Sequence, residues 1–318
     1  MTLTPSIGPA MPKFLPVGRP KRTHPSGFHA RYRRSPDLPN DDSARRCVSE
    51  YMRASATARG GEPSRSAGRR NPTRKETVVA TVAGKAILIT GGNRGIGHAL
   101  TLEALNRGAG RVYVGTRKAL PDNSDPRVTP LTLDITDQAH LEAAAGRVDS
   151  LDIVVNNAGL ALYDDLSDPS ALQQHLAVNL FGTYAVIRTF LPLLVRSGGS
   201  IVNNLSVNAL APLPLIPAYS VSKAAAFSMT QSLRAILAGQ GVRVHAVLTG
   251  PVDTEMTRGL EIPKASPQSV ARAIFEGVEN DDDEIFPDPL SRSLAELWGS
   301  GATKVLERQY AALLDADH

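Results

Sequence analysis

The sequence predicts an α/β fold built on one doubly wound parallel sheet with helices on both faces. The first observation is a set of short, continuous apolar runs, such as residues 86–90, which have the composition of strands buried on both sides. The second is that segments of helical periodicity separate these runs, as the crossover connections of a parallel sheet require. The third is length, because residues 78–318 suffice for one domain with a large core.

Each element has a signal of its own in the sequence. The expected strands are 86–90, 111–115, 130–133, 151–155, 200–205 and 242–247. The expected helices are 96–106, 137–146, 168–196, 217–239, one that begins at Ser266-Pro267, and a last one at 291–314. The connection between the second and third strands holds Pro121 and Pro126, so we expect its helix to be reduced to a turn. Residues 251–266 show little periodicity and are expected to form a mobile lid over a ligand.

Residues 1–77 differ in composition from the rest of the chain. They hold 16 basic and 6 acidic side chains and 10 of the 23 prolines, whereas residues 78–318 hold 19 basic and 25 acidic side chains. The basic character of the chain therefore belongs to this segment, and a segment so rich in Arg and Pro cannot bury enough apolar surface to order itself. The sequence predicts a disordered tail over 1–77 and one folded domain over 78–318.

Three interpretations of the tail compete. Arginine clusters could contact the phosphates of a nucleic acid, but the four aromatic residues of the tail show no stacking pattern. An organelle transit peptide would be rich in Arg and Ser, but the tail lacks the amphipathic apolar stripe of such a peptide. The interpretation we prefer is an extension without function, which would follow from a start codon assigned too far upstream, with Met52 as a later candidate.

Composition excludes several classes of protein. The single cysteine, Cys47, cannot form an internal disulfide, and the histidines of the folded region form no pair with metal-ligand spacing. No apolar run approaches the length of about 18 residues that a membrane span needs, and no GxSxG elbow of a serine hydrolase is present. We expect no metal, no membrane and no nucleic-acid partner, and we interpret the acidic run 281–284 as a solvated turn.

The turn after the first expected strand carries glycines where a phosphate could bind. It reads Thr90-Gly91-Gly92-Asn93-Arg94-Gly95-Ile96-Gly97 and lies between a strand and the start of a helix. Glycines there permit a tight turn and a close approach of the backbone to a pyrophosphate, while free N–H groups and the helix dipole face the anion. A purely structural turn remains the alternative at this point.

The TGxxxGxG spacing resembles the cofactor loop of the classical short-chain dehydrogenase/reductase family, and further motifs follow in the order of that family. Asn156-Asn157-Ala158-Gly159 is similar to its NNAG segment, and Tyr219 with Lys223 is similar to its YxxxK motif. Ser206 lies 13 residues before the tyrosine, as the family's serine does. The resemblance spans roughly 84–287 and implies a single Rossmann-type domain. It departs from the family at Thr249-Gly250, where relatives have Pro-Gly.

The resemblance also assigns roles. Asn179 matches the catalytic asparagine, and Asp134 matches an acid that accepts from the adenine amine. The predicted catalytic residues are Asn179, Ser206, Tyr219 and Lys223. The predicted cofactor contacts are Thr90, Gly91, Asn93, Arg94, Gly95, Ile96, Gly97, Thr116, Arg117, Asp134, Ile135, Asn157, Ala158, Gly159, Tyr219, Lys223, Gly250, Val252 and Thr254. Taken singly, these side chains have structural alternatives, such as capping a helix, ending a strand or facing solvent.

The spacing of Tyr219 and Lys223 suggests chemistry. A helix from about 217 places them at i and i+4 on one face, so the ammonium can lie close to the phenol. A positive neighbour favours phenolate and is expected to move the phenol pKa from about 10 toward neutrality, where a proton donor or acceptor works best. Tyr219 would then exchange a proton with the substrate oxygen as hydride moves to or from its carbon. As the resemblance implies, Ser206 holds that oxygen, Lys223 also grips the nicotinamide ribose, and Asn179 positions a water for proton relay.

The end of the second expected strand indicates the choice of cofactor. An NAD enzyme usually needs an acid there, which accepts from the ribose 2′-hydroxyl. This chain reads Val114-Gly115-Thr116-Arg117-Lys118 and has no acid at that place. Arg117 together with Arg94 could pair with a 2′-phosphate, so the sequence favours NADP(H) over NAD(H), unless both arginines are ordinary surface residues.

These patterns together predict a cytoplasmic, NADP(H)-dependent oxidoreductase that interconverts an alcohol and a carbonyl. The expected lining residues in 161–164, 207–216 and 253–266 are largely apolar, which favours a small or medium, largely uncharged substrate. We expect a homodimer or homotetramer built on the apolar faces of the 180–196 and 217–239 helices. The alternatives are a catalytically idle dinucleotide-sensing or scaffold protein of the same fold, and an enzyme whose tail adds a nucleic-acid or targeting function.

Overall fold

The computed structural model describes residues 81–118, 120 and 125–315. The chain divides into two units, Met1–Thr73 and Arg74–His318, and every described residue belongs to the second. The disordered tail that the sequence predicts over 1–77 therefore lies outside the described residues.

Seven parallel strands form one sheet in the order β3-β2-β1-β4-β5-β6-β7. The strands are β1 (Ala86–Thr90), β2 (Arg111–Thr116), β3 (Val128–Thr132), β4 (Ile153–Asn156), β5 (Ser200–Asn204), β6 (Arg243–Val247) and β7 (Glu284–Ile285). The chain runs outward from β1 to β3, returns to β4 on the other side of β1, and then runs outward to β7. This reversal makes a topological switch point between β1 and β4, and ligands of such sheets bind at the carboxyl ends of the strands there.

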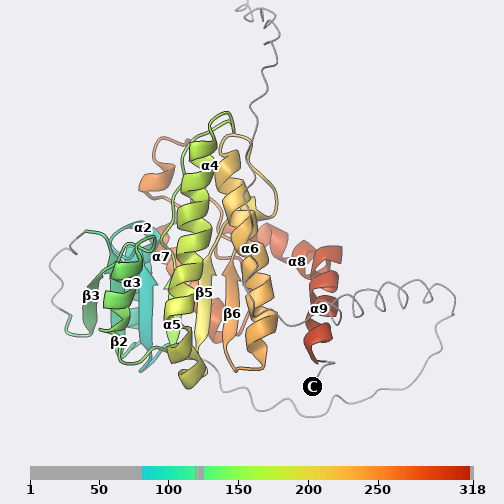
Figure 1. Ribbon diagram of the computed structural model, residues 1–318. Coiled ribbons are helices and arrows are strands. Elements are labelled where there is room, and N and C mark those ends of the chain that lie inside the picture. Colours follow the sequence, from blue (N-terminus) through green and yellow to red (C-terminus); the bar gives the residue numbers. More distant parts are fainter. Residues whose placement is uncertain (1–80, 119, 121–124, 316–318) are drawn as a thin grey trace, which may run out of the picture. The chain divides into compact units, whose positions relative to one another are not determined.

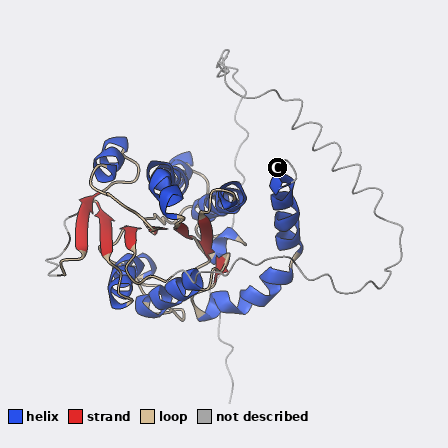
Figure 2. Cartoon of the chain, turned by 90° about the horizontal axis from the view of Figure 1, so that it is seen from below, coloured by secondary structure: helices blue, strands red, loops and turns tan. Residues whose placement is uncertain are grey.

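Helices cover both faces of the sheet, as Figures 1 and 2 show. On one face α2 (Gly95–Asn106) packs against α7 (Pro267–Glu279), and on the other lie α3 (Gln138–Ala145), α5 (Thr183–Ser197) and α6 (Pro217–Ala238). Successive residues of β1 enter two different cores, because Ile87 and Ile89 pack with α2 and α7 while Leu88 packs with α3 and α5. A strand buried on both faces reads as a continuous apolar run, so the predicted fold class is confirmed.

The predicted helix over 168–196 is interrupted in the structure. It consists of α4 (Pro169–Leu176), a π-helical segment η1 (Ala177–Gly182) and α5. At the end of η1, a Cβ added to Gly182 would lie 2.8 Å from the Ile135 side chain, so the chain closely approaches the turn between β3 and α3 there. The run Pro169–Ser197 is long and apolar enough for a membrane span by composition, because an 18-residue window within it has a mean hydropathy of 1.5. Several of its apolar residues, such as Phe190 and Leu194, are fully buried in the core of the domain, and core helices also meet that criterion.

The end of the chain differs from the prediction in two ways. The single helix expected over 291–314 is instead α8 (Pro289–Ser300) and α9 (Ala302–Asp315), with Gly301 between them. The acidic run 281–284 is not a simple solvated turn, because Glu284 lies in β7 with a side chain that is 5% exposed. Its carboxylate lies 2.8 Å from the guanidinium of Arg234 on α6 and 2.8 Å from Nζ of Lys304 on α9. Two basic side chains from distant segments thus draw the acid into the interior, which no local pattern indicates.

The segments around the expected site are short. The 3₁₀ turn η2 (Val207–Ala209) follows β5, and the 3₁₀ turn η3 (Glu255–Thr257) lies within the expected lid over 251–266. A β-bridge between Val252 and Ala265 closes the base of that segment, and its mobility stays a prediction. Between β2 and β3, the residues that the structure describes contain no helix, in keeping with the expected reduction to a turn.

Candidate active site

The glycine turn joins β1 to α2 at the carboxyl edge of the sheet. Gly91 has φ +67°, and a Cβ added to it would lie 3.0 Å from the Cα of Ala158. A Cβ on Gly97 would collide with the carbonyl oxygen of Gly91. Arg94 is the N-cap of α2, and no side chain in the described chain caps this helix, so the N–H groups of its first turn remain available. The turn therefore fits the pyrophosphate of a dinucleotide, which needs a close backbone surface and free N–H donors.

The loop after β4 is hydrogen-bonded to this turn across the switch point. Oγ1 of Thr90 accepts from the backbone N–H groups of Asn157 and Ala158, each at 3.0 Å. Nδ2 of Asn157 donates to the carbonyl oxygens of Thr90, at 3.0 Å, and Gly91, at 3.3 Å. The structure thus brings together two groups of predicted cofactor contacts that lie far apart in the sequence.

Tyr219 lies in the first turn of α6, with its ring buried. Its hydroxyl is hydrogen-bonded to the hydroxyl of Ser206, which precedes η2 at the end of β5. Lys223, one turn further along α6, places Nζ 5.6 Å from the centroid of the Tyr219 ring and donates to the carbonyl oxygen of Asn204 at 2.9 Å. The three predicted catalytic side chains Ser206, Tyr219 and Lys223 therefore meet at the carboxyl ends of the strands.

The acid strength of Tyr219 departs from the expectation. Burial raises the pKa of Tyr219 to about 12, although the hydrogen bond with Ser206 acts in the opposite direction. Burial also lowers the pKa of Lys223 to about 8, because its ammonium is withdrawn from water. The expected lowering of the Tyr219 pKa is wrong for the protein by itself, since desolvation outweighs the hydrogen bond with Ser206. At neutral pH the protein therefore presents Tyr219 as a neutral phenol.

Asn179 lies in the π-helical segment and is 2% exposed. Its Oδ1 accepts from the N–H of Leu160 at 2.8 Å, and its Nδ2 donates to the carbonyl oxygen of Leu160 and to Oγ of Ser222, both at 2.9 Å. Both N–H groups of the amide are therefore used within the protein. A Cβ on Gly159 would lie 3.4 Å from Oδ1 of Asn179 and 3.8 Å from Nζ of Lys223, so the loop after β4 runs directly beside these side chains.

The two arginines expected to select the cofactor lie at the exposed edge of the site. The side chain of Arg117 is 75% exposed and lies 3.9 Å from Oδ2 of Asp134. The side chain of Arg94 is 68% exposed and lies 3.7 Å from Oε2 of Glu255. Ion pairs this long and this exposed contribute little stability, so either guanidinium can exchange its partner for a phosphate at small cost.

The remaining predicted contacts divide into two groups. The side chain of Ile135 packs against the backbone of Gly182, and that of Val252 belongs to the core beneath α2 and α7. Cγ2 of Thr254, in contrast, would lie 3.2 Å from a Cβ on Gly95, which brings the loop after β6 to the glycine turn. Thr116 is buried, and its Oγ1 accepts from the N–H of Lys118 at 3.2 Å.

Asp134 keeps its carboxylate at this edge. Its Oδ1 accepts from the N–H and the hydroxyl of Thr136, at 3.0 and 2.7 Å. Burial raises the pKa of Asp134, but these hydrogen bonds together with the charges of Arg117 and His140 outweigh burial, so that the pKa lies below its usual value. Its predicted contact with adenine would have to use the oxygen that faces Arg117.

His175 is a residue of the site that the sequence analysis missed. It is fully buried, and its ring meets the Tyr219 ring edge to face at 6.2 Å and 74°. Nδ1 lies 2.7 Å from the carbonyl oxygen of Ala171, and Nε2 accepts from the N–H of Leu162 at 3.0 Å, which fixes the neutral tautomer. Its place four residues before Asn179, and hence on the same helix face, was the available signal.

Two carboxylates that the sequence analysis also missed hold the rim of the site. Asp288 is 1% exposed and accepts from the N–H of Gly250 at 2.7 Å, and it also caps α8. Asp164, in the loop after β4, accepts from the N–H of Ala218 at 3.2 Å and so caps the helix that carries Tyr219. Asp288 stands directly before Pro289, and that Asp-Pro pair was a usable signal for a helix cap.

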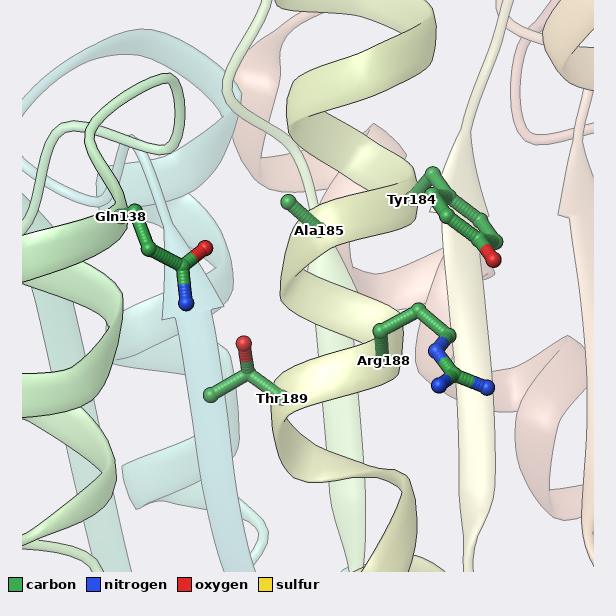
Figure 3. Close-up of a pocket in the computed structure, with 5 residues that line it drawn as sticks. All are labelled: Gln138, Tyr184, Ala185, Arg188 and Thr189. Carbon is green, nitrogen blue, oxygen red and sulfur yellow. The ribbon is translucent and has the colours of Figure 1, made fainter. Parts of the chain in front are cut away.

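A separate groove lies between α3 and α5, away from these side chains. It has a volume of about 400 Å³ and is lined by Gln138, Tyr184, Ala185, Arg188 and Thr189. Tyr184, Ala185, Arg188 and Thr189 belong to α5 and Gln138 to α3, and Figure 3 shows Ala185 and Thr189 on the side of α5 toward Gln138. None of them is a predicted site residue.

The model of the short chain dehydrogenase family matches residues 85–264, which is more than half of the chain. The chain belongs to the short chain dehydrogenase family. It is 35% identical over 201 residues to a short chain dehydrogenase of Monascus ruber, and 34% identical over 223 residues to one of Aspergillus terreus. These matches cover 57% and 64% of this chain, and 66% and 48% of the relatives, so the chain spans only half to two thirds of these curated proteins.

A solved structure covers the fold more completely. A short chain dehydrogenase from Burkholderia cenocepacia, crystallised in complex with NADP, is 37% identical, with a TM-score of 0.66. The match covers 72% of this dehydrogenase and 98% of that chain. Members of the family are oxidoreductases that act on CH–OH groups with a nicotinamide dinucleotide, and this chain shares their fold and motifs.

Proposed function

We propose that this dehydrogenase uses NADP(H) to interconvert an alcohol and a carbonyl on a small or medium, largely uncharged organic substrate. The observation that carries the proposal is the buried cluster of Ser206, Tyr219 and Lys223 beside the glycine turn. A hydroxyl pair at the carboxyl ends of the strands can hold one oxygen of a substrate, and the turn beside it fits a dinucleotide.

The residues of the chain have distinct roles in this proposal. When bound, the reduced cofactor would supply hydride to the carbonyl carbon, and in the opposite direction the oxidised cofactor would accept it. Tyr219 would donate its phenolic proton to the substrate oxygen in reduction, and its phenolate would accept the proton of the alcohol in oxidation. Ser206, already hydrogen-bonded to the Tyr219 hydroxyl, holds the same oxygen. Asn179 contributes by fixing Leu160 beside the site, because both N–H groups of its amide are occupied.

The choice of NADP(H) rests on charge at the outer edge of the site. The glycine turn would hold the pyrophosphate, and Lys223 the nicotinamide ribose. Arg94 and Arg117 would pair with the 2′-phosphate, since both are exposed and only loosely paired. The Burkholderia relative was crystallised with NADP, which supports the same choice.

The substrate class follows from the loops around the site. Large apolar side chains are exposed on the loop after β4, on the loop before α6 and on the segment over 251–266. They are Leu162, Tyr163, Leu213, Leu215, Met256 and Ile262. Such a rim favours an uncharged, hydrophobic carbonyl compound over a charged metabolite.

We also propose that the enzyme is a homo-oligomer. The outer surface of η1, α5 and α6 exposes apolar side chains that a monomer would leave in water. They are Phe181, Tyr184, Val221 and Ile236, of which Phe181 is 62% exposed. Light scattering tests this expectation, and a protein that is monomeric at every concentration would reject it.

The test of the function is a panel of ketones, aldehydes and alcohols with NADPH, NADH and their oxidised forms, followed at the nicotinamide absorbance band. The change Tyr219→Phe removes the exchangeable proton and keeps the ring, so turnover should fall at least about a hundredfold while NADPH still binds. Tyr113→Phe, in the core strand β2, is the matched control and should keep normal turnover. Normal turnover of Tyr219→Phe would reject the proposed role.

A further inference from the structure

Thr249 forms a side-chain hydrogen bond at the start of the loop after β6. It is 6% exposed, and its hydroxyl donates to Oδ1 of Asn204 at 2.8 Å. The bond ties the loop that follows β6 to the end of β5.

Asn204 forms further hydrogen bonds, one to Asn157 and one to Lys223. Its Nδ2 donates to Oδ1 of Asn157 at 3.0 Å, and Asn157 in turn donates to the carbonyl oxygens of Thr90 and Gly91. The backbone carbonyl of Asn204 accepts from Nζ of Lys223 at 2.9 Å. One chain of side-chain hydrogen bonds therefore runs from the loop after β6 to the glycine turn. It includes Asn204, whose backbone carbonyl also holds Lys223.

The direction of each amide in this chain depends on its neighbour. An amide presents an acceptor on one side and donors on the other. The Thr249 hydroxyl holds Oδ1 of Asn204 toward itself and so turns Nδ2 toward Asn157. If Asn204 were rotated by half a turn, two carbonyl-type oxygens would face each other, and Asn157 would have to rotate away from the glycine turn. The hydroxyl of Thr249 thus orients two amides in series.

We propose that Thr249 and Asn204 are positioning residues, which align the loop after β6 with Lys223 and with the glycine turn for cofactor binding. The inference rests on the proposed function, because the groups that the two residues align are the predicted cofactor contacts. Neither residue needs to touch the cofactor by its side chain. Their effect reaches it through Asn157 and through the backbone of the glycine turn.

The neighbouring residues provide a matched control. Nδ2 of Asn156 donates to Oδ1 of Asn203 at 2.8 Å, and Nδ2 of Asn203 donates to Oγ1 of Thr230 at 2.9 Å. This second Asn-Asn-Thr chain is buried inside the domain and ends at the carbonyl oxygen of Ala226, so these bonds reach neither the glycine turn nor Lys223. A variant of Thr230 therefore removes the same kind of bond without the proposed link to the cofactor.

The experiment compares Thr249→Val, which keeps the shape and loses the hydroxyl, with Thr249→Ser, which keeps the hydroxyl, and with Thr230→Val. The dissociation constant for NADPH is measured by nicotinamide fluorescence, and thermal stability is measured on the same samples. Thr249→Val should raise the dissociation constant about fivefold, the effect of one neutral hydrogen bond. Thr249→Ser should stay within about twofold of the wild type, and Thr230→Val should lower the melting temperature while leaving the dissociation constant unchanged.

A second measurement needs no ligand. Thr249 and Asn157 are not hydrogen-bonded to each other, so their effects on thermal stability should be independent unless Asn204 links them. In a cycle of Thr249→Val and Asn157→Ala, the second change should lower the melting temperature by less than half as much once the first is present.

The outcomes separate this inference from the proposed function. A wild type that binds neither dinucleotide refutes the function, and the stability cycle then decides whether the hydrogen-bond chain exists. A wild type that binds NADPH, with equal affinities in Thr249→Val and Thr249→Ser, overturns the positioning role. An equal loss of affinity in Thr230→Val would also overturn it, because a general loss of stability would then explain the effect. Additive losses in the cycle overturn the link through Asn204.

Discussion

Replacing Arg94 and Arg117 with alanine should weaken the binding of NADPH far more than that of NADH. The two guanidinium groups are the candidate partners of a 2′-phosphate, the only group by which these cofactors differ. Each is exposed and held only by a long ion pair, with Glu255 at 3.7 Å or with Asp134 at 3.9 Å. The charge is therefore present in the free protein and available to a ligand.

The magnitude follows from those contacts. A charge-assisted hydrogen bond contributes about 1.5 to 3 kcal/mol. The exposed ion pair that each arginine gives up on binding is worth about 0 to 1 kcal/mol. A net gain of about 1.5 kcal/mol for each arginine, or about 3 kcal/mol for both, corresponds to a rise of about a hundredfold in the dissociation constant. NADH offers no phosphate to these side chains, so its dissociation constant should change less than about threefold.

Fluorescence titration of wild type, single and double variants with both cofactors measures this difference. Arg258→Ala is the matched control, because that side chain is also 75% exposed and lies 3.1 Å from Glu255. Equal losses for the two dinucleotides in the double variant would refute the reasoning. A wild type that already prefers NADH would refute it as well, since Arg94 and Arg117 would then be ordinary surface residues.

Three further predictions concern proton transfer, the tail and the end of the chain. Because burial raises the pKa of Tyr219 to about 12, reduction should keep its proton donor between about pH 6 and 9, while oxidation, which needs the phenolate, should rise with pH. Profiles of kcat in both directions check this, and an oxidation plateau below about pH 7 would contradict it. Removal of residues 1–77 should leave thermal stability and turnover unchanged, and loss of folded protein would show that this segment is needed for folding. Lys304→Met should cost about 3 kcal/mol, because Lys304 is 4% exposed among three carboxylates, and should lower the melting temperature by about 6 to 12 °C in calorimetry. An unchanged melting temperature would show that Arg234 alone neutralises the cluster.

Most of the fold could be predicted from patterns that are local in the sequence. The strand over 86–90 appears at the bounds predicted, because four apolar residues and a threonine followed by glycines already describe a buried strand and the turn after it. The helix that carries Tyr219 likewise begins at Pro217, which suits the first position of a helix. The predicted bounds of a helix were wrong where a contact with a distant part of the chain shaped that helix. The helix predicted over 168–196 contains a π-helical segment around Asn179. The close approach of Gly182 to Ile135 at the end of that segment joins two distant parts of the sequence, so no local pattern could indicate it.

The sequence by itself determined the fold class, the family and which side chains could serve catalysis, because these depend on periodicity and on ordered motifs. Tertiary structure alone decided how the side chains behave. Only packing revealed that burial outweighs the hydrogen bond with Ser206 and raises the phenol pKa of Tyr219, since desolvation depends on every neighbour in space. Only the folded chain brought Thr249, Asn204 and Asn157 into one line of hydrogen bonds, because β6, β5 and β4 are adjacent in the sheet but far apart in the sequence. The motifs identify the side chains that could take part in catalysis, and the folded structure sets the protonation and orientation of those side chains.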